Sequence, residues 1–565
     1  MLIIFFIFST LILFSTIGFG LIFSKILKFE NFNYNYGIIG ILGLFILSVI
    51  ASYTHLVVSH HYVHNIILIL IGLMGLLFLN KSNLNEIKFV FLTFILLFIA
   101  LIIAKTNEDF GYYHLPNSLQ FSEQKLQFGL GNLNHGFKHV SSLFMIMSSN
   151  YLPYVDHFLF NLTNFLFLTF FVTFVLKEIY FNNKKNLNLS NFVISLFLVL
   201  VLSKFSRLAE YGSDIAGQLV ILISFFYILE FFFNESIKEN KINYLKISIL
   251  LIIFASTLKF ISVIYAILFG IFFLKIQKKI KTILSLVQIN FIIYVILATS
   301  IFLFLNFAAT GCVIYPIEIT CTSNYFEWAL DSDVVQSLNF VYEVWSKGGL
   351  GPGFSVDNQN EYIKYLNWVP NWTNVYFIGK FSDYIFVTIL IIFIYACFFF
   401  KDLFYSKKIN LKKKKSYLFF YFLMAVIFFV WFLNFPSLRY SGYVIVFILL
   451  IFPFSIYASQ KINFSNENYI KKISIIFLIS YSIFLIKNIS RISNELKLAE
   501  TGHHNFSNFP FYWTDKKSFK RIKLNNHDLY LTNGKCWDTP STCVRFTDSI
   551  KITKKNNYIF YIKTK

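Results

Sequence analysis

The chain opens with the apolar stretch MLIIFFIFSTLILFSTIGFGLIF, which runs from Met1 to Phe23. A helix of about 20 such residues crosses the roughly 30 Å hydrocarbon core of a bilayer. The stretch lacks the basic start and the small-residue cleavage site of a signal peptide, so we expect it to be retained as a first membrane helix. Comparable blocks recur through the chain, which has 565 residues and is 57% hydrophobic, 20% aromatic and 14% charged. The sequence therefore predicts a polytopic membrane protein.

The apolar blocks predict an all-α fold with about 14 transmembrane helices. These helices are expected over residues 1–24, 36–55, 65–80, 88–105, 156–177, 190–204, 214–234, 244–258, 260–275, 283–306, 382–401, 416–434, 441–459 and 472–490. Lysines cluster in every second connecting loop, which predicts that those loops are cytoplasmic. Both termini then lie outside, which for a chain in the cytoplasmic (inner) membrane of a bacterium would be the periplasm. Basic cytoplasmic loops also explain the formal net charge of +21, so we expect no nucleic acid as a partner.

The segment from Lys246 to Lys275 is an apolar block interrupted only by Lys259. The loops on both sides are basic, so an even number of crossings fits better than one long helix. A hairpin of two short helices would place Lys259 at a tight turn near the outer face. Each arm would be about 24 Å long at 1.5 Å per residue, which leaves a second alternative: a helix pair that dips in from the cytoplasm without spanning the membrane.

Three outer loops and a tail are predicted on the periplasmic side. The loops cover residues 105–155, 204–213 and 307–381. We expect these loops to belong to one transmembrane domain of residues 1–496. The tail, residues 497–565, contains alternating stretches at His527–Thr532 and Tyr558–Lys563, and such alternation is typical of β-strands. We therefore expect a small β-rich C-terminal domain outside the cytoplasm.

Two adjacent carboxylates, Glu108 and Asp109, follow the fourth apolar block in the stretch NEDFGYYHLPNSLQ of Asn107–Gln120. A carboxylate just outside a membrane helix can accept a proton from a hydroxyl as a general base, hold a divalent cation or orient a sugar. Asp109 is the better candidate for the base, because Tyr113 and His114 follow within reach as substrate-binding residues. The alternative is a helix cap with an aromatic belt at the membrane interface.

The next residues, Leu126–Ser149, predict a loop followed by an amphipathic stretch that lies on the membrane surface. His135 and His139 have the i, i+4 spacing of a metal-binding pair, but no further ligands lie near them in the sequence. The metal is therefore left unassigned, with Mg²⁺ or Mn²⁺ as the divalent cations to consider.

A further group of charges lies in SRLAEYGSDIAGQ, from Ser206 to Gln218. Arg207, Glu210 and Asp214 crowd the mouth of a predicted helix pair, where a charge is costly unless it is paired or faces a water-filled cavity. These residues either pair with one another or shape a substrate-binding pocket opposite the acidic loop.

Two isolated cations are predicted near the same face: Lys259 in STLKFIS and Arg439 in FPSLRYSG. A lipid-linked sugar donor carries a phosphate at the membrane surface. Lys or Arg can bind that phosphate and stabilise the charge that develops on the leaving group. The alternative is that both side chains snorkel to the interface.

Four of the five cysteines form two closely spaced pairs in predicted periplasmic segments, Cys312 with Cys321 and Cys536 with Cys543. In an oxidising compartment such pairs predict two local disulfides. A zinc site made of all four thiols is the alternative, and it requires the tail to meet the loop. Cys397 lies inside a predicted membrane helix and should be a free apolar residue.

Three tryptophans, Trp345, Trp368 and Trp372, flank the glycine-rich stretch Gly348–Gly353. Tryptophan faces suit sugar rings, but tryptophan near a membrane surface is more often an interfacial anchor. We favour the anchor.

Together these segments resemble the GT-C superfamily of multi-pass glycosyltransferases, most closely an uncharacterised bacterial branch. The resemblance rests on NEDFGYYHLP, RLAEYGSD, TLKF, TGCVIYP and CWDTPSTC. In that superfamily an acidic residue of the first large outer loop is taken as the catalytic base, which maps to Asp109 with Glu108 beside it. Cationic residues of later outer loops contact the lipid phosphate, which suits Lys259 and Arg439. The resemblance also implies that transfer inverts the anomeric centre.

The function implied by the resemblance is transfer of a sugar from a polyprenyl-phosphate-linked donor to a cell-envelope glycan or lipid acceptor on the periplasmic face. The partners would be that donor, that acceptor and membrane lipids. One alternative is an O-antigen polymerase or ligase, which usually relies on arginine-rich outer loops that this chain lacks. Another is a non-enzymatic lipid or polysaccharide transporter, which would place ionisable residues deep inside several helices.

Overall fold

The computed structural model describes residues 2–29, 35–79, 84–102, 109–180, 189–205, 212–234, 241–274, 288–351, 353–405, 414–462, 467–500, 519–525, 527–545 and 549–564. Within these residues, nine helices are long and apolar enough to cross a membrane. They are α1 (Leu2–Ile26), α2 (Tyr36–His55), α7 (Leu162–Tyr180), α10 (Ser213–Phe233), α13 (Ile289–Thr310), α17 (Ser382–Phe398), α19 (Lys414–Asn434), α20 (Tyr443–Lys461) and α21 (Glu467–Glu500). Shorter helices complete the set: α3 (Tyr62–Gly75), α4 (Leu84–Leu97), α8 (Leu189–Lys204), α11 (Lys241–Leu258) and η8 (Phe260–Leu274). Every predicted membrane segment overlaps one of these helices, so the prediction of a mostly helical fold is confirmed. Nine helices of the described residues have the length and composition of a membrane span, as a membrane protein requires.

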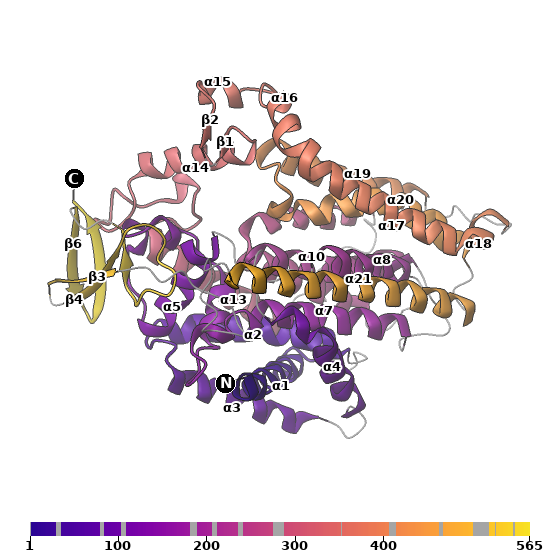
Figure 1. Cartoon of the computed structure of the whole chain (residues 1–565), viewed down its shortest axis with the longest axis horizontal. Coiled ribbons are helices and arrows are strands. Elements are labelled where there is room, and N and C mark those ends of the chain that lie inside the picture. The colour runs from indigo at the N-terminus through magenta and orange to yellow at the C-terminus, as the bar shows by residue number, and fades with distance from the viewer. Residues whose placement is uncertain are drawn as a thin grey trace.

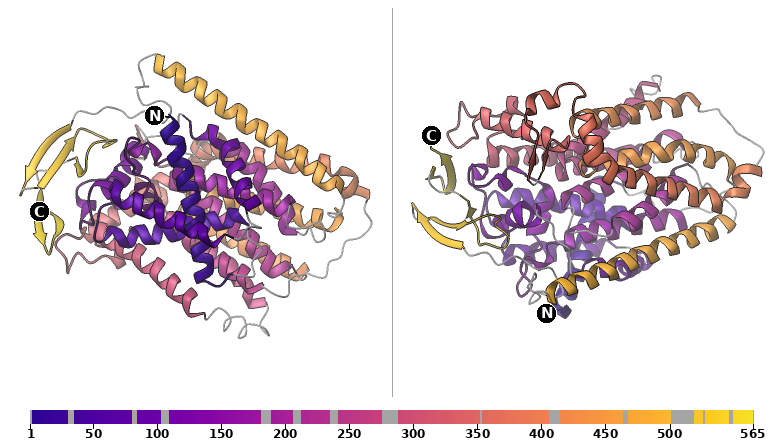
Figure 2. Two further views of the ribbon diagram at one scale, coloured as in Figure 1. Left: turned by 90° about the horizontal axis from the view of Figure 1, so that it is seen from below. Right: turned by 45° about the horizontal axis from the view of Figure 1, so that its top comes forward.

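The helices form a bundle with a buried centre. Most of the long helices lie side by side along the longest axis of the molecule (Figure 1). The most apolar windows of α7 and α10 are fully buried, whereas those of α17, α19 and α21 are 28% buried. Figure 2 shows α21 running along the edge of the bundle. The C-terminal strands lie at one end of the bundle and α18 (Phe400–Tyr405) lies at the other (Figure 1).

The helices α11 and η8 form a hairpin with Lys259 at its turn. At the start of η8 the hydroxyl of Ser262 is hydrogen-bonded to that of Ser441 at 3.1 Å. Near its other end, the ring of Phe272 packs 5.1 Å from that of Phe232, at the far end of α10. η8 therefore runs back along the bundle, which confirms the hairpin. It is a 3-10 helix with a rise of about 2.0 Å per residue, so its 15 residues reach roughly 30 Å, longer than an α-helix of the same sequence.

The segment predicted to be the first outer loop, which we call the first outer segment, is folded into one end of the bundle. A π-helical turn, η4 (Phe110–His114), leads into α5 (Leu115–Glu123). The short helix α6 (Ser142–Ser148) is buried and contacts α2, α5, α7 and α11. The prediction that residues 126–149 form an amphipathic stretch on the membrane surface is therefore wrong, because the apolar side chains of α6 pack against protein.

A later segment, predicted as an outer loop, lies over the top of the bundle in Figure 1, with its first helix toward the C-terminal strands; we call this segment the cap. It consists of α14 (Ser332–Ser346), the hairpin β1 (Leu350–Gly351) and β2 (Phe354–Ser355), α15 (Gln359–Ile363), α16 (Val369–Trp372) and the π-helical η11 (Thr373–Phe381). The last element of the cap, η11, continues directly into the membrane-length helix α17.

The C-terminal region is β-rich, as predicted. Its strands are β3 (Phe519–Leu524), β4 (His527–Thr532), β5 (Cys543–Val544), β6 (Ile550–Lys555) and β7 (Tyr558–Lys563). β3 and β4 pair antiparallel, β5 pairs parallel to β4, and β6 and β7 form a separate antiparallel pair. The two alternating stretches of the sequence became β4 and β7, because a strand with one buried face needs that pattern.

The strands do not form a core alone. Leu130, Leu133 and Phe137 of the first outer segment pack with apolar residues of the strands, among them Leu529 and Tyr561. The backbone N–H of residue 128 donates to the carbonyl of residue 559, and the N–H of residue 561 donates to the carbonyl of residue 128, both at 2.9 Å. The first outer segment therefore completes the hydrophobic core of the C-terminal region.

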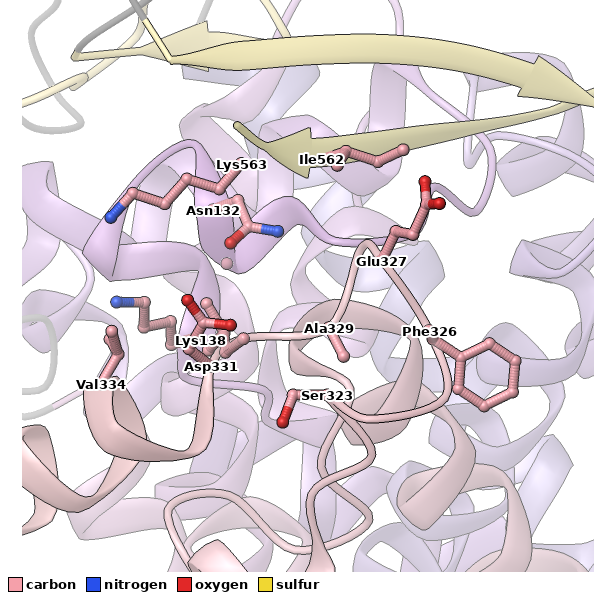
Figure 3. A pocket seen from close by; sticks show the side chains of 12 residues that line it. Asn132, Lys138, Ser323, Phe326, Glu327, Ala329, Asp331, Val334, Ile562 and Lys563 are labelled. Atoms are coloured by element: carbon pink, nitrogen blue, oxygen red, sulfur yellow. The ribbon is translucent and has the colours of Figure 1, made fainter. Parts of the chain in front are cut away.

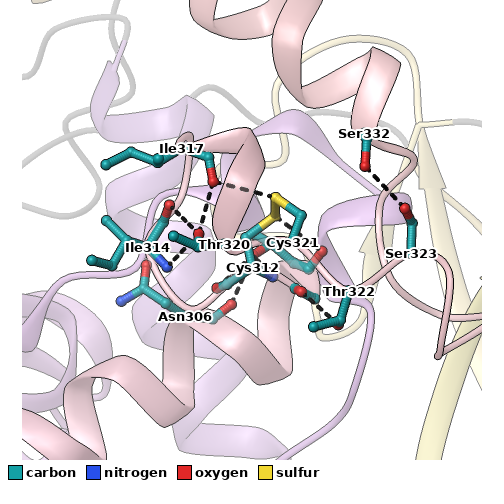
Figure 4. Close-up of a disulfide and its surroundings, with 11 residues drawn as sticks. Asn306, Cys312, Ile314, Ile317, Thr320, Cys321, Thr322, Ser323 and Ser332 are labelled. Carbon is teal, nitrogen blue, oxygen red and sulfur yellow. Dashed lines mark hydrogen bonds between the residues drawn. A yellow bond between two sulfur atoms is a disulfide. The ribbon is translucent and has the colours of Figure 1, made fainter.

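Both predicted cysteine pairs are disulfides, with S–S distances of 2.04 Å for Cys312–Cys321 and 2.03 Å for Cys536–Cys543. The first closes a turn between α13 and α14, in which the hydroxyl of Thr320 donates to a nearby backbone carbonyl (Figure 4). Cys397 is a free cysteine on the exposed side of α17. The local pairing rules out the zinc alternative for these four thiols.

Candidate functional site

Four charged side chains meet at the end of the bundle that carries the strands. Lys259 Nζ lies 2.8 Å from Asp214 Oδ1, and Arg439 Nε donates to Asp214 Oδ2 at 2.9 Å. Arg439 Nη2 also donates to Asp109 Oδ2. We call Asp109, Asp214, Lys259 and Arg439 the ionic cluster. The sequence placed these four residues on one face, and the structure brings them into direct contact across a sequence separation of 330 residues.

Each member of the ionic cluster comes from a turn or a helix start. Asp109 precedes η4, and Asp214 lies in the first turn of α10. Lys259 is the turn of the α11–η8 hairpin, and Arg439 lies in the π-helical turn η12 (Leu438–Gly442) before α20. Helix ends at a membrane surface tolerate charge better than helix middles. The cluster therefore forms where the starts of η4 and α10, the α11–η8 turn and η12 meet.

The members of the cluster differ in exposure. The side chain of Asp214 is 3% exposed, whereas those of Asp109, Lys259 and Arg439 are 27%, 24% and 38% exposed. Asp214 is thus a buried anchor that holds two cations, and the other three side chains remain accessible. Two carboxylates and two cations balance in charge, so the cluster is close to neutral as it stands.

The pKa of Asp109 reflects this pairing. Burial alone would raise that pKa, but the positive charges of Arg439 and Lys259 outweigh burial and hold the pKa below its usual value. Asp109 is therefore an ionised carboxylate at neutral pH. It becomes a stronger base once Arg439 is drawn away from it.

The turn that carries Arg439 is held by aromatic residues. Trp372 Nε1 donates to the carbonyl of Pro436 at 3.0 Å, and Trp431 Nε1 donates to the carbonyl of Ser437 at 3.2 Å. The hydroxyl of Tyr376 accepts from the next backbone N–H, that of residue 438, at 2.7 Å. These contacts fix the turn from which Arg439 reaches the cluster.

The tryptophans of the cap depart from prediction. Trp368 and Trp372 are buried, with 0% and 4% exposure, and their rings pack 6.0 Å apart. Their prediction as interfacial anchors is wrong, because they fill the space beneath the turn before α20. Trp345 is 49% exposed and keeps the position that an anchor requires.

His114 lies beneath the cluster and is fully buried between η4 and the start of α10. Gly212 covers its ring at φ +48°, and a Cβ there would lie 2.1 Å from His114 Cε1, so only glycine fits. Burial, with smaller contributions from Arg439 and Lys259, lowers the pKa of His114 to about 4. The ring is therefore neutral at pH 7, and its Nδ1 has no hydrogen-bond partner among the described residues.

Tyr113 connects the cluster to a group of rings that the sequence did not predict. Its ring packs 5.3 Å from that of His139. The hydroxyl of Tyr342 is hydrogen-bonded to His135 Nε2 at 3.0 Å and to the hydroxyl of Tyr315 at 2.8 Å. These rings come from three separate segments, so no local pattern could have grouped them.

Tyr440 is a second residue that the sequence missed. Its ring lies 5.1 Å from Lys259 Nζ and 5.7 Å from Arg439 Cζ, within the range of cation–π attraction. Tyr440 directly follows Arg439 in FPSLRYSG, and this position beside the cation is the signal that could have identified it.

The donor groups do not suit a divalent cation. No group of three or more His, Cys, Asp or Glu side chains suited to a metal ion occurs in the part of the chain that the structure describes. The carboxylates of Asp109 and Asp214 are paired with Arg439 and Lys259. Binding Mg²⁺ or Mn²⁺ would require both cations to leave, so we derive no step through a metal.

The disulfide loop of the tail packs behind Asp109. The N–H of Trp537 donates to the carbonyl of Gly111 at 2.9 Å. A Cβ on Gly111 would lie 2.3 Å from Trp537 Cδ2, so glycine permits this close approach. The loop closed by Cys536 and Cys543 therefore supports the turn that presents Asp109.

Three predicted site residues cannot be placed. Glu108, Arg207 and Glu210 lie outside the described residues. Their predicted roles beside Asp109 and in the pocket wall therefore stay predictions.

Replacing Asp214 by asparagine should destabilise this end of the protein. The change leaves Lys259 and Arg439 without their buried partner. Breaking a fully buried pair costs about 3–5 kcal/mol, and the partial exposure of the two cations reduces this to roughly 1–3 kcal/mol. Thermal unfolding of the purified full chain in detergent checks this. Asp383, exposed in the first turn of α17, gives the matched control Asp383→Asn, which should unfold like wild type. Equal melting of both variants would contradict the anchoring role of Asp214.

Comparison with known proteins identifies a family without naming an activity. A family described as Domain of unknown function (DUF8201) matches residues 1–446. No curated protein and no solved structure matches the chain. The matched range contains all four residues of the ionic cluster and most of the helical bundle. The chain therefore belongs to the DUF8201 family.

Proposed function

We propose that this protein is a GT-C-like membrane glycosyltransferase with about 14 crossings and both termini in the periplasm. It would transfer a sugar from a polyprenyl-phosphate-linked donor to a cell-envelope glycan or lipid acceptor. The observation that carries the proposal is the ionic cluster. It combines a paired but accessible carboxylate with two oriented cations at the end of membrane-length helices.

The cations suit the phosphate of a lipid-linked donor. Asp214 orients Lys259 and Arg439 before any substrate binds, so little reorganisation is needed when the phosphate arrives. Both side chains are partly exposed, and a polyprenyl chain can remain among the apolar helices while its phosphate reaches the cluster. Arginine also offers a planar set of donors that matches phosphate oxygens.

The carboxylate suits the base. In the proposed step, the donor phosphate draws Arg439 away from Asp109, and the pKa of Asp109 rises because its main positive neighbour has turned to the phosphate. The acceptor hydroxyl then gives its proton to Asp109 as its oxygen bonds to the anomeric carbon. The bond from that carbon to the phosphate oxygen breaks, and its electron pair stays on the polyprenyl phosphate. Attack from the opposite face inverts the anomeric centre.

The residues around the ionic cluster fit a supporting role in this proposal. His114 is neutral and buried beneath Asp109, so it can position that carboxylate without competing for the proton. Tyr113 and Tyr440 place aromatic rings near the cluster, and a sugar ring can pack against such rings.

Deletion of the gene tests the class of activity. A strain without this protein should make an envelope glycan that lacks one sugar residue, with an unchanged distribution of chain lengths and accumulation of the unmodified acceptor. Mass spectrometry of the glycans and of the lipid-linked precursors measures all three. The same strain carrying the wild-type gene is the control.

The alternatives give different products in that experiment. Loss of a polymerase would shorten the chains to single repeats, and loss of a ligase would leave complete chains on the lipid carrier. Loss of a transporter would trap the lipid-linked glycan on the cytoplasmic side. Any of these three results would contradict the proposed transfer.

A further inference from the structure

A cavity lies away from the ionic cluster, where three parts of the chain meet. It has a volume of about 320 Å³. The segment around Asn132 and Lys138, the loop from Ser323 to Val334, and the end of β7 around Lys563 line it (Figure 3). None of these residues belongs to the ionic cluster, and the proposed transfer does not use them.

Two lysines, Lys138 and Lys563, line the cavity together with two carboxylates, Glu327 and Asp331. Neither lysine makes an ion pair with a carboxylate of the described residues. Burial, together with the charge of Lys563, lowers the pKa of Lys138 to about 8. Burial and the neighbouring positive charge both disfavour the ammonium form of Lys138, and an anion bound in the cavity would favour that form.

The rest of the lining combines polar side chains, aliphatic side chains and one aromatic ring. Figure 3 shows Lys138, Lys563, Asn132 and Asp331 on one side of the cavity and Phe326 and Glu327 on the other. Phe326 is 43% exposed and rests against Trp328, with ring centroids 5.6 Å apart. Carboxylate oxygens accept hydrogen bonds from hydroxyls, and an exposed aromatic face packs against a sugar ring.

The cavity is connected to the ionic cluster through one short segment. Lys138 lines the cavity, and the next residue, His139, packs its ring 5.3 Å from that of Tyr113. Gly136 in the same segment approaches the backbone of Tyr112 closely, because a Cβ there would lie 2.6 Å from its carbonyl oxygen. The segment from Gly136 to His139 would therefore separate a ligand in the cavity from Tyr113.

We propose that this cavity binds an anionic saccharide, with its carboxylate or phosphate held by Lys138 and Lys563, its hydroxyls by Asp331 and Glu327, and one ring against Phe326. As the binding site of an acidic acceptor glycan, it rests on the proposed transferase function. The binding itself does not require that function.

Direct binding to the purified full chain in detergent tests the proposal. The probe is tetragalacturonate, and its fully methyl-esterified form is the neutral counterpart with the same sugar skeleton. Isothermal titration should show at least about tenfold tighter binding of the acid, because each charge-assisted hydrogen bond contributes about 1.5–3 kcal/mol. Inorganic phosphate should compete if the lysines hold the oxyanion.

Matched variants assign the binding to the cavity. Lys138→Gln and Lys563→Gln should each weaken the acid at least about tenfold, and Lys138→Arg should restore it. Lys554→Gln, on the exposed side of β6, should bind like wild type. Asp109→Asn should also bind like wild type while losing transfer, so a failed transferase function and a failed binding site give different results.

Three results would overturn the proposal. They are equal affinity for the acid and its ester, no loss of affinity in either glutamine variant, and binding of phosphate with no measurable binding of the saccharide.

Discussion

Asp109→Asn should abolish sugar transfer while leaving the donor phosphate bound. An asparagine keeps the shape of the side chain but cannot accept the hydroxyl proton. Loss of a general base lowers the rate by about 100- to 10,000-fold. Arg439 loses its partner at this position and turns fully to the phosphate, so affinity for polyprenyl phosphate should be unchanged or higher. A purely structural role of Asp109 would not give a loss of turnover together with an unchanged or higher affinity for polyprenyl phosphate.

The measurement uses purified protein with a polyprenyl-phosphate sugar and the acceptor that the deletion strain accumulates. Single-turnover transfer and equilibrium binding of polyprenyl phosphate are followed separately. Asp528→Asn is the matched control, because Asp528 is also paired with an arginine, Arg521, but lies on the exposed β3–β4 sheet. Wild-type turnover by Asp109→Asn would remove Asp109 as the base.

Arg439→Gln should have the complementary effect. It removes the group that bridges both carboxylates and would carry the donor phosphate. Loss of one preorganised donor to a developing oxyanion costs about 100- to 1,000-fold in rate, and the affinity for polyprenyl phosphate should fall as well. The pKa of Asp109 should rise toward its usual value, because Arg439 is the main charge that lowers it.

The conservative change separates charge from geometry in that result. Arg439→Lys keeps the positive charge but not the planar set of donors, so it should recover part of the binding and little of the turnover. Arg521→Gln, which removes an exposed arginine with 65% side-chain exposure, should behave like wild type in both assays. If Arg439→Gln binds polyprenyl phosphate as tightly as wild type, the cluster does not hold the donor.

Much of the fold could be predicted because the membrane imposes a simple rule. Long apolar blocks must become helices, since lipid offers no partner for backbone polar groups. The alternation in β4 and β7 was equally direct. The length of η8 was not predictable, because the sequence does not say that this arm takes the longer rise of a 3-10 helix.

The ionic cluster could be anticipated for a related reason. A charge beside an apolar helix needs a partner or a task, and the basic loops had already placed four such charges on one face. For Asp214 the sequence left an ion pair with Arg207 as the alternative to a place in a pocket wall. For Lys259 and Arg439 the alternative to phosphate binding was snorkelling, and for Asp109 the alternative to a general base was a helix cap. The structure shows that these charges do pair, and it adds that one member, Asp214, is buried while the other three are accessible.

The supporting residues were missed because their contacts join distant segments. Trp537 packs on Gly111, and Tyr342 reaches His135, each across hundreds of positions without a shared motif. Trp372 was assigned to the membrane surface from its local setting. Its real partner is a turn that comes 64 residues later in the chain. Such contacts depend on the folded arrangement and have no local signature.

If the ionic cluster holds the donor phosphate, a photoreactive polyprenyl phosphate should crosslink to residues beside that cluster. A polyprenyl phosphate with a photoreactive diazirine on the first isoprene unit is bound to the full chain and activated, and the labelled peptides are identified by mass spectrometry. We expect label in the turn Leu438–Gly442 and around Lys259, suppressed by excess unlabelled polyprenyl phosphate and lost in Arg439→Gln. Competable label confined to the opposite end of the bundle, near α18, would contradict the account.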